Sequence, residues 1–141
     1  MKRKASAVWQ GGLKDGKGTV STDSGVLKNA QYSFSTRFED GIGTNPEELI
    51  AAAHAGCFAM ALSGQLGSEG LTATSIQVTA AVTLDKTDAG FTVTASHLDV
   101  NVQIPGADQA AFEKAANNAK AGCPISRLLN AEITMDAKLQ S

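Results

Sequence analysis

Small and apolar residues occupy almost every position of the chain from residue 49 to residue 62, with no polar side to the pattern. A helix without a polar face is normally buried rather than on the surface, so this run predicts a long buried helix within 43–64. The run is too short and too rich in alanine to predict a membrane span, and it contains His54. Cys57 lies in the middle of the predicted helix.

The residues before this run mark the start of the helix. Asn45 is a residue type that caps helix N-termini, and Pro46 suits the first helical position. Glu47 and Glu48 follow, where negative charge complements the positive end of the helix dipole. The simplest interpretation of both carboxylates is therefore a stabilising role in the first turn.

Elsewhere the apolar positions recur at every second residue, which is the pattern of a half-buried strand. Within 31–38 the alternation is clean, with aromatic side chains on one side and Arg37 on the other. Two runs rich in valine, threonine and isoleucine, separated by the turn 85–90, predict a β-hairpin. The predicted strands are 1–10, 19–22, 31–38, 75–84, 91–104 and 131–139.

Two further helices are expected between the hairpin and the last strand. Residues 108–121 have a helical composition with Asp108 as the N-cap, and Gly122 ends them. Pro124 then opens a short helix over 124–130. The order of elements predicts an α+β fold, with an antiparallel sheet packed on one side by helices, in a single domain over 1–141.

Composition narrows the classes of partner. The 141 residues carry a net charge of −2, with a pI near 5.6 and only 5% aromatic residues. This balance leaves no basic surface for phosphates and few rings for stacking bases, so we expect no nucleic-acid partner. No secretory signal or membrane segment is apparent, which predicts a cytoplasmic protein with reduced thiols and no membrane partner.

The two cysteines differ in their local surroundings. Cys57 lies in apolar company, where burial raises a thiol's pKa and makes it inert unless a cation is near. Cys123 precedes the short helix that Pro124 opens, where the helix dipole and unpaired amides stabilise a thiolate. Local physics therefore ranks Cys123 as the more acidic thiol. Neither cysteine belongs to a CxxC motif, and we expect no metal site.

The remaining polar candidates have ordinary structural interpretations. Arg37, by itself, is a surface charge on a strand, and His54 is a hydrogen-bonded histidine of the core. His97 lies on a strand, at a face of the sheet, and points to no function of its own.

Three stretches together are specific for a family. They are TNPEELIAAAHAGCF around Cys57, the segment FSTRFE that contains Arg37, and AGCPIS around Cys123. With GKGTVSTDSGVL early and AEIT late in the chain, they resemble the OsmC branch of the OsmC/Ohr hydroperoxide reductases over nearly the whole length. The resemblance implies an OsmC/Ohr-like fold in which antiparallel sheets pack around a long buried central helix. It also implies an intertwined homodimer with active sites at its interface.

The resemblance further implies a cofactor-free thiol peroxidase in oxidative or osmotic stress defence, with peroxiredoxin-like activity. It would reduce organic hydroperoxides to alcohols, and hydrogen peroxide more slowly. Cys57 would be the peroxidatic cysteine, which forms a sulfenic acid, and Cys123 would condense with it to a disulfide. Arg37 would hold the Cys57 thiolate, and Glu47 would orient Arg37. A small or lipoyl-type dithiol would then reduce the disulfide.

Apolar residues near these positions are candidates for contact with the substrate. An apolar wall would favour alkyl or aryl hydroperoxides over hydrogen peroxide. The candidate substrate-binding residues are Phe38, Ile42, Phe58 and Met60.

Glu47 and Cys57 are ten residues apart, which corresponds to about 15 Å along one straight helix. One arginine cannot readily touch both in a single chain, so we expect Arg37 and Glu47 to serve the Cys57 of the partner subunit. The alternative is a helix that breaks between them, or two separate helices.

Two other functions are compatible with the same residues. The chain could be a binding protein for a small hydrophobic ligand, with the cysteines as packing residues. It could also be a thiol redox sensor, although no DNA-reading element is evident.

Overall fold

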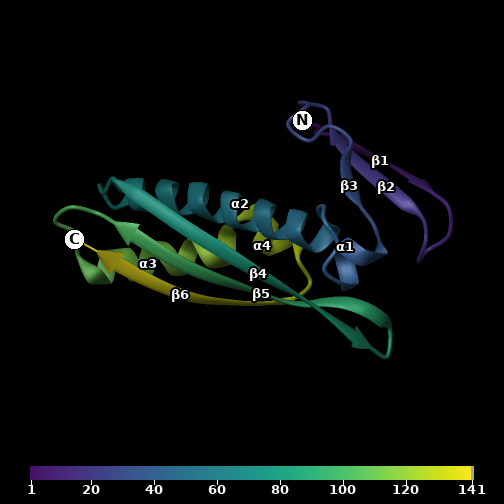
Figure 1. Ribbon diagram of the computed structural model, residues 1–141. Helices are drawn as coiled ribbons and strands as arrows, with labels where there is room; N and C mark the ends of the chain where they lie inside the picture. Colours follow the sequence, from purple (N-terminus) through teal and green to yellow (C-terminus); the bar gives the residue numbers. More distant parts are fainter. Residues whose placement is uncertain (141) are drawn as a thin grey trace. The chain divides into compact units, whose positions relative to one another are not determined.

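A computed structural model describes residues 1–140, and these fall into two compact units that divide between Leu49 and Ile50. Figure 1 shows the helices and strands of both units. The elements are β1 (Ala5–Gln10), β2 (Lys17–Thr22), β3 (Ala30–Tyr32), α1 (Phe34–Phe38), α2 (Pro46–Ser68), β4 (Ser75–Thr87), β5 (Gly90–Gln103), α3 (Gln109–Gly122), α4 (Pro124–Leu128) and β6 (Glu132–Gln140).

The first unit is built on an antiparallel sheet of β1, β2 and β3, in that order. Val8 pairs with Thr19, and Thr19 in turn pairs with Gln31. The predicted strands at 1–10 and 19–22 are confirmed, with bounds moved by a few residues.

The predicted strand over 31–38 is wrong beyond Tyr32, because residues 34–38 form the helix α1 instead. Ser33 and Thr36 explain the change, since they make a reciprocal capping box. The Ser33 hydroxyl accepts from the Thr36 N–H at 3.3 Å, and the Thr36 hydroxyl accepts from the Ser33 N–H at 2.8 Å. These local hydrogen bonds outweigh the alternating pattern, and they place Arg37 on a helix rather than on a strand.

The start of α2 is tied to α1 by the residue that caps it. The Asn45 side chain accepts the Glu48 N–H at 2.8 Å and donates to the Thr36 carbonyl at 2.9 Å. Just before it, Gly43 has φ of +142°, and a Cβ there would collide with the Gln31 carbonyl oxygen. The predicted cap is confirmed, and the arrangement holds the first turn of α2 beside α1.

Helix α2 is continuous from Pro46 to Ser68, so it runs one turn beyond the predicted end, and the alternative of a break between Glu47 and Cys57 is wrong. The expectation that it is buried on every side is also wrong for the single chain. Only a stripe spaced by four residues is buried, and that stripe is His54, Phe58, Leu62 and Leu66. Small and apolar residues on its other sides, such as Met60, are exposed.

The second unit has its core between α2, α3 and one face of a second sheet. The α2 stripe packs with alternate residues of β5 (Leu98, Val100, Val102) and with Phe112 of α3. In Figure 1, α3 follows the sheet beside β6. Although α2 has the length and hydropathy of a membrane span, it serves as the central helix of this fold, with its buried stripe in the core.

The second sheet is mixed rather than wholly antiparallel. The hairpin of β4 and β5 is antiparallel, as predicted, with Thr79 opposite Asp99. Strand β6 pairs with β5 in parallel, with Leu98 opposite Met135. The expectation of antiparallel pairing throughout is therefore wrong at β6. The physical reason is the connection, because α3 and α4 carry the chain back along the sheet before β6 begins.

Candidate active site

The two cysteines come together in the second unit, although they lie far apart in the sequence. Cys57 lies on α2 and is half-buried, whereas Cys123 is fully buried and caps the N-terminus of α4. Both are free thiols. Their side chains lie next to each other, and the backbone N–H of Ile125 is close to both sulfurs. The Cys123 sulfur also accepts the Ser126 N–H at 3.4 Å.

The surroundings shift the pKa values of the two thiols in opposite directions. Burial is the main cause that raises the pKa of Cys57, and the neighbouring Cys123 raises it further. The backbone N–H of Ile125 lowers this pKa, but by less than the other two effects raise it. Burial also acts to raise the pKa of Cys123, but hydrogen bonds from the Ser126 backbone and hydroxyl, from Cys57 and from Ile125 together lower it. The local ranking of Cys123 as the more acidic thiol agrees with this arrangement.

Arg37 and Glu47 form the second constellation, within the first unit. Arg37 lies on α1, and its Nε donates to Glu47 Oε1 at 2.8 Å and Oε2 at 3.2 Å. A terminal guanidinium nitrogen lies 2.7 Å from Oε1, and the Glu47 side chain is only 11% exposed. This bidentate contact fixes the plane of the guanidinium, and the ammonium group of a lysine could not make the same contact.

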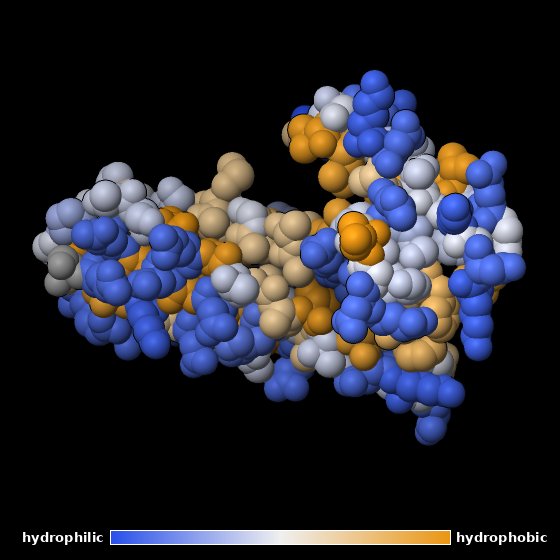
Figure 2. Space-filling view, viewed as in Figure 1, coloured by the Kyte–Doolittle hydropathy of each residue, from blue (hydrophilic) through white to orange (hydrophobic). Residues whose placement is uncertain are grey.

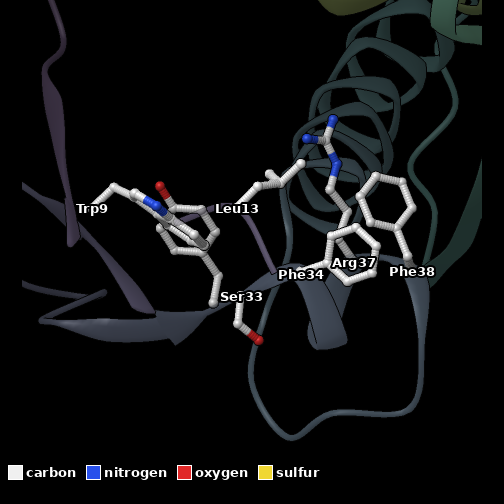
Figure 3. Close-up of a pocket in the computed structure, with 7 residues that line it drawn as sticks. Trp9, Leu13, Ser33, Phe34, Arg37 and Phe38 are labelled. Carbon is white, nitrogen blue, oxygen red and sulfur yellow. The ribbon is translucent and has the colours of Figure 1, made fainter. Parts of the chain in front are cut away.

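A pocket of about 300 Å³ opens beside Arg37, as Figure 3 shows. Its walls come from β1, the β1–β2 loop, β3 and α1, and they are mostly aromatic. The guanidinium carbon of Arg37 lies 5.4 Å from the centre of the Phe38 ring, and the rings of Phe34 and Phe38 are 4.9 Å apart. The lining residues are Trp9, Leu13, Tyr32, Ser33, Phe34, Arg37 and Phe38.

The four predicted substrate contacts lie in different surroundings. Phe38 lines the pocket beside Arg37. Ile42 is 91% exposed in the first unit, and Met60 is 80% exposed on α2. Phe58 is fully buried in the core of the second unit, so we assign it to packing rather than to the substrate site. The sequence reasoning missed Trp9 and Leu13, because they lie in a separate segment that only the fold brings to Arg37.

A buried polar network lies next to the cysteines and was not foreseen in full. His54 is a hydrogen-bonded core residue, as predicted. Its Nδ1 is 2.7 Å from the hydroxyl oxygen of Ser96 on β5, and its Nε2 is 2.8 Å from that of Ser126 on α4. No local signal could have identified these two serines, since three distant segments meet at the imidazole.

One group of side chains in the described residues has the composition of a cation site. His97, Asp99 and Asp136 place their ligand atoms within 4.8 Å of one another on the second sheet. His97 Nε2 is 3.4 Å from a carboxylate oxygen of each aspartate, and Nδ1 is hydrogen-bonded to Thr134. Both carboxylates are exposed, so we assign the group as surface polar contacts of His97.

Three comparisons with known proteins point to the same protein family. A family model described as OsmC-like protein matches residues 39–138. The chain is 57% identical over 139 residues to the peroxiredoxin OsmC of Escherichia coli strain K12, which covers 99% of this chain and 97% of that protein. It is 30% identical over 124 residues to the organic hydroperoxide resistance protein OhrB of Bacillus subtilis strain 168, covering 87% and 88% of the two chains.

The fold has known counterparts as well. An OsmC-like protein of unknown function from Vibrio cholerae O1 biovar eltor superimposes with a TM-score of 0.79 at 18% identity. The match covers 98% of this chain and 99% of that one. An identity this low shows the shared α+β architecture, with two small sheets and a central helix, and nothing beyond it.

Proposed function

Since the chain belongs to the OsmC family, we propose that this cysteine-based peroxidase reduces organic hydroperoxides with Cys57 as nucleophile and Cys123 as resolving thiol. The observation that carries the proposal is the contact between the two free thiols at the N-terminus of α4. A half-buried thiol beside a fully buried one suits a nucleophile that meets the peroxide first and a partner that then closes the disulfide.

The reaction takes two steps before reduction. The Cys57 thiolate attacks one peroxide oxygen, the O–O bond breaks, and the departing alkoxide takes up a proton to become the alcohol. Cys57 is left as a sulfenic acid. Cys123 then loses its proton and attacks the Cys57 sulfur as a thiolate, the S–O bond breaks, and the hydroxide that leaves takes up a proton to become water. An external dithiol, small or lipoyl-type, reduces the resulting disulfide by thiol exchange.

Arg37 supplies what Cys57 lacks in its own unit. Burial raises the pKa of Cys57, so a permanent cation is needed to hold the thiolate. The same guanidinium can stabilise negative charge on the leaving alkoxide. Glu47 holds Arg37 in a fixed plane through three contacts of 2.7 to 3.2 Å, which reduces the reorganisation needed when the peroxide binds.

Arg37 and Glu47 act on the partner subunit's Cys57 in a homodimer. Because α2 is continuous, Glu47 and Cys57 of one chain are separated by about 15 Å of helix. The exposed small and apolar residues of α2 (Ala52, Ala53, Gly56 and Met60) offer a surface that a second chain can cover. Figure 2, seen from the same side as Figure 1, shows tan to pale, weakly hydrophobic colours along the edge of the second unit where α2 runs.

The aromatic pocket beside Arg37 would hold the organic group of the hydroperoxide. Rings such as Phe34 and Phe38 provide apolar contact for an alkyl or aryl chain. Hydrogen peroxide has no such group and gains nothing from these walls, so it reacts more slowly. Two free thiols that must be cycled by a dithiol also suit a cytoplasmic protein.

The first test is the mass and free-thiol count of reduced protein after one equivalent of cumene hydroperoxide, with hydrogen peroxide in parallel. We expect rapid loss of both thiols as a Cys57–Cys123 bond within one chain, and slower loss with hydrogen peroxide. Thiols that stay free for many minutes would overturn the proposal. Oxidation without turnover in the presence of a dithiol would instead favour a redox sensor.

Mixed dimers test the sharing of residues between subunits. A Cys57→Ser chain is paired with an Arg37→Ala chain, and the activity of the heterodimer is compared with that of each homodimer. Each active site built across the interface then draws its cation from one chain and its thiol from the other. Partial recovery supports the exchange, whereas activity no higher than that of the homodimers contradicts it.

A further inference from the structure

We propose that His54 is a positioning residue for the resolving thiol, and that it acts through Ser126. In this arrangement a buried chain of hydrogen bonds, from Ser96 through His54 to Ser126, aims the hydroxyl hydrogen of Ser126 at the sulfur of Cys123. The inference rests on the proposed function for its kinetic consequence, but not for its geometry.

The geometry leaves His54 little freedom. The imidazole is fully buried, and both of its nitrogens are within hydrogen-bond distance of a serine hydroxyl, at 2.7 Å and 2.8 Å. Ser96 is fully buried on β5, and Ser126 is 9% exposed in the first turn of α4. Among the described residues no buried side-chain polar atom lacks a partner. The network is therefore complete, and its members can be assigned as donors and acceptors.

The imidazole is neutral, because burial lowers the pKa of His54 below its ordinary value of 6.5. A neutral imidazole has one N–H donor and one acceptor nitrogen. Each serine has one hydroxyl hydrogen. Only two arrangements satisfy these counts, and they differ in the direction in which the hydrogen bonds run along the chain.

Cys123 decides between the two arrangements. The backbone N–H of Ser126 donates to the sulfur at 3.4 Å, which places the Ser126 side chain next to Cys123. That side chain also acts to lower the pKa of the Cys123 thiol, and a hydroxyl does so by donating its hydrogen to the sulfur. A hydroxyl that donates to sulfur must accept at its oxygen, so Nε2 of His54 carries the hydrogen and donates to Ser126. Nδ1 then accepts from the Ser96 hydroxyl. In the opposite arrangement Ser126 donates to His54 and has no hydrogen left for the thiolate.

The consequence belongs to the second step of the reaction. Resolution requires the Cys123 thiolate to attack the sulfenic sulfur of Cys57, and the thiolate fraction sets its rate. A hydroxyl aimed at the sulfur stabilises that thiolate. Loss of the chain should therefore slow disulfide closure without slowing the attack of Cys57 on the peroxide. His54 itself does not touch the reacting atoms.

The direct test uses Cys57→Ser protein, which leaves Cys123 as its single cysteine. The cysteine is labelled with ¹³C at Cβ, and its chemical shift is followed by NMR as a function of pH. Relative to this background, Ser126→Ala should raise the apparent pKa of Cys123. Arg127→Ala, an exposed neighbour on the same short helix, is the matched control and should leave the pKa unchanged. An unchanged value in Ser126→Ala would overturn the proposal.

The imidazole provides a second, independent readout. Long-range ¹⁵N–¹H correlation spectra distinguish the two neutral tautomers, and the chain contains only two histidines to assign. We expect the Nε2–H tautomer for His54, and the Nδ1–H tautomer would overturn the proposal. His54→Gln, whose amide can both donate and accept, should preserve more of the low Cys123 pKa than His54→Leu. Equal effects of the two substitutions would mean that His54 acts only through packing.

Single-turnover kinetics test the functional part in protein with both cysteines. With cumene hydroperoxide, Ser126→Ala should accumulate the Cys57 sulfenic acid, trapped with dimedone, and close the disulfide roughly tenfold more slowly, as expected for one hydrogen bond to a charged group. Closure at the parent rate would overturn the kinetic role. Since the two NMR measurements use no peroxide, failure of the peroxidase proposal would not be confused with failure of this one.

Discussion

Cys57 and Cys123 show how two identical side chains acquire different acidities. At Cys123 the backbone N–H groups of Ile125 and Ser126 converge on the sulfur and lower its pKa despite complete burial. At Cys57 burial prevails and raises the pKa. A nucleophile at Cys57 therefore depends on a cation that its own surroundings do not supply. This makes Arg37 the residue on which the proposed chemistry depends most.

We predict that Arg37→Ala lowers the single-turnover rate with cumene hydroperoxide roughly 100-fold, as for the loss of one donor to a developing oxyanion. Arg37→Lys should retain only part of the rate, because an ammonium group cannot reproduce the bidentate contact of the guanidinium with the Glu47 carboxylate. Stopped-flow fluorescence of Trp9, the single tryptophan, monitors the reaction from the pocket itself. Arg127→Ala is the control.

The same substitution should have little effect on folding. The Arg37 side chain is 38% exposed, and ion pairs that open to solvent contribute at most about 1 kcal/mol to stability. A large fall in the unfolding free energy of Arg37→Ala would mean that the loss of activity reflects damage to the fold.

His54 gives a pH prediction for stability. Its pKa is lowered in the folded protein, so the unfolded chain binds a proton more readily. The contribution of neutral His54 is therefore present above its ordinary pKa of 6.5, and it is lost as the pH falls below that value towards the folded pKa. We expect the free energy of unfolding to decline over this range in urea titrations. His54→Gln should decline less steeply, and an identical slope would contradict the assignment.

At the scale of elements, α2 has two faces with different roles, one buried in the core and one exposed. Every fourth residue of its central part enters the core, and Ala52, Ala53, Gly56 and Met60 on the other side form an exposed surface of small and apolar residues. The stripe contains both the large packing residue Phe58 and the polar His54. Stability and the orientation of the buried network consequently depend on the same face of one helix.

Phe58→Ala should reduce the free energy of unfolding by about 3–5 kcal/mol, because it leaves a cavity in a close-packed core. Phe91→Ala is a matched control, since Phe91 is 60% exposed on β5, and we expect it to cost under about 1 kcal/mol. Denaturant unfolding of both variants decides the point. Similar losses would show that Phe58 is not a core residue.

At the scale of the whole molecule, the proposed function requires two chains. In the proposed homodimer, the exposed small residues of α2 allow close approach of a second chain. A dimer would cover apolar surface that remains open in the single chain. The active site would then depend on assembly, and a monomeric variant would lose activity without losing its fold.

Met60→Glu should therefore yield a folded monomer with strongly reduced peroxidase activity, because it puts a charge into the proposed interface. Gly67→Glu is the control on the same helix, where a side chain meets open space. Light scattering coupled to size-exclusion chromatography measures the mass of each variant. A dimeric and active Met60→Glu protein would exclude this face of α2 from the interface.

A feature of the fold could be predicted from the sequence when the residues that form it lie close together along the chain. The start of α2 at Asn45, the hairpin of β4 and β5, and the cap of α4 at Cys123 were predictable, because each depends on residues a few positions apart. The strand wrongly predicted over 31–38 was also a local matter. There the capping box of Ser33 and Thr36 prevailed over an alternating pattern.

The sequence by itself determined most of the elements, the two cysteines and, through its motifs, the family. Only the tertiary structure decided that β6 runs parallel to β5, that α2 buries one stripe, and that Ser96 and Ser126 meet His54. The physical reason is that these contacts join segments far apart in the chain. Their partners are selected by packing and by the need to satisfy buried polar groups, and no local pattern of residues records either choice.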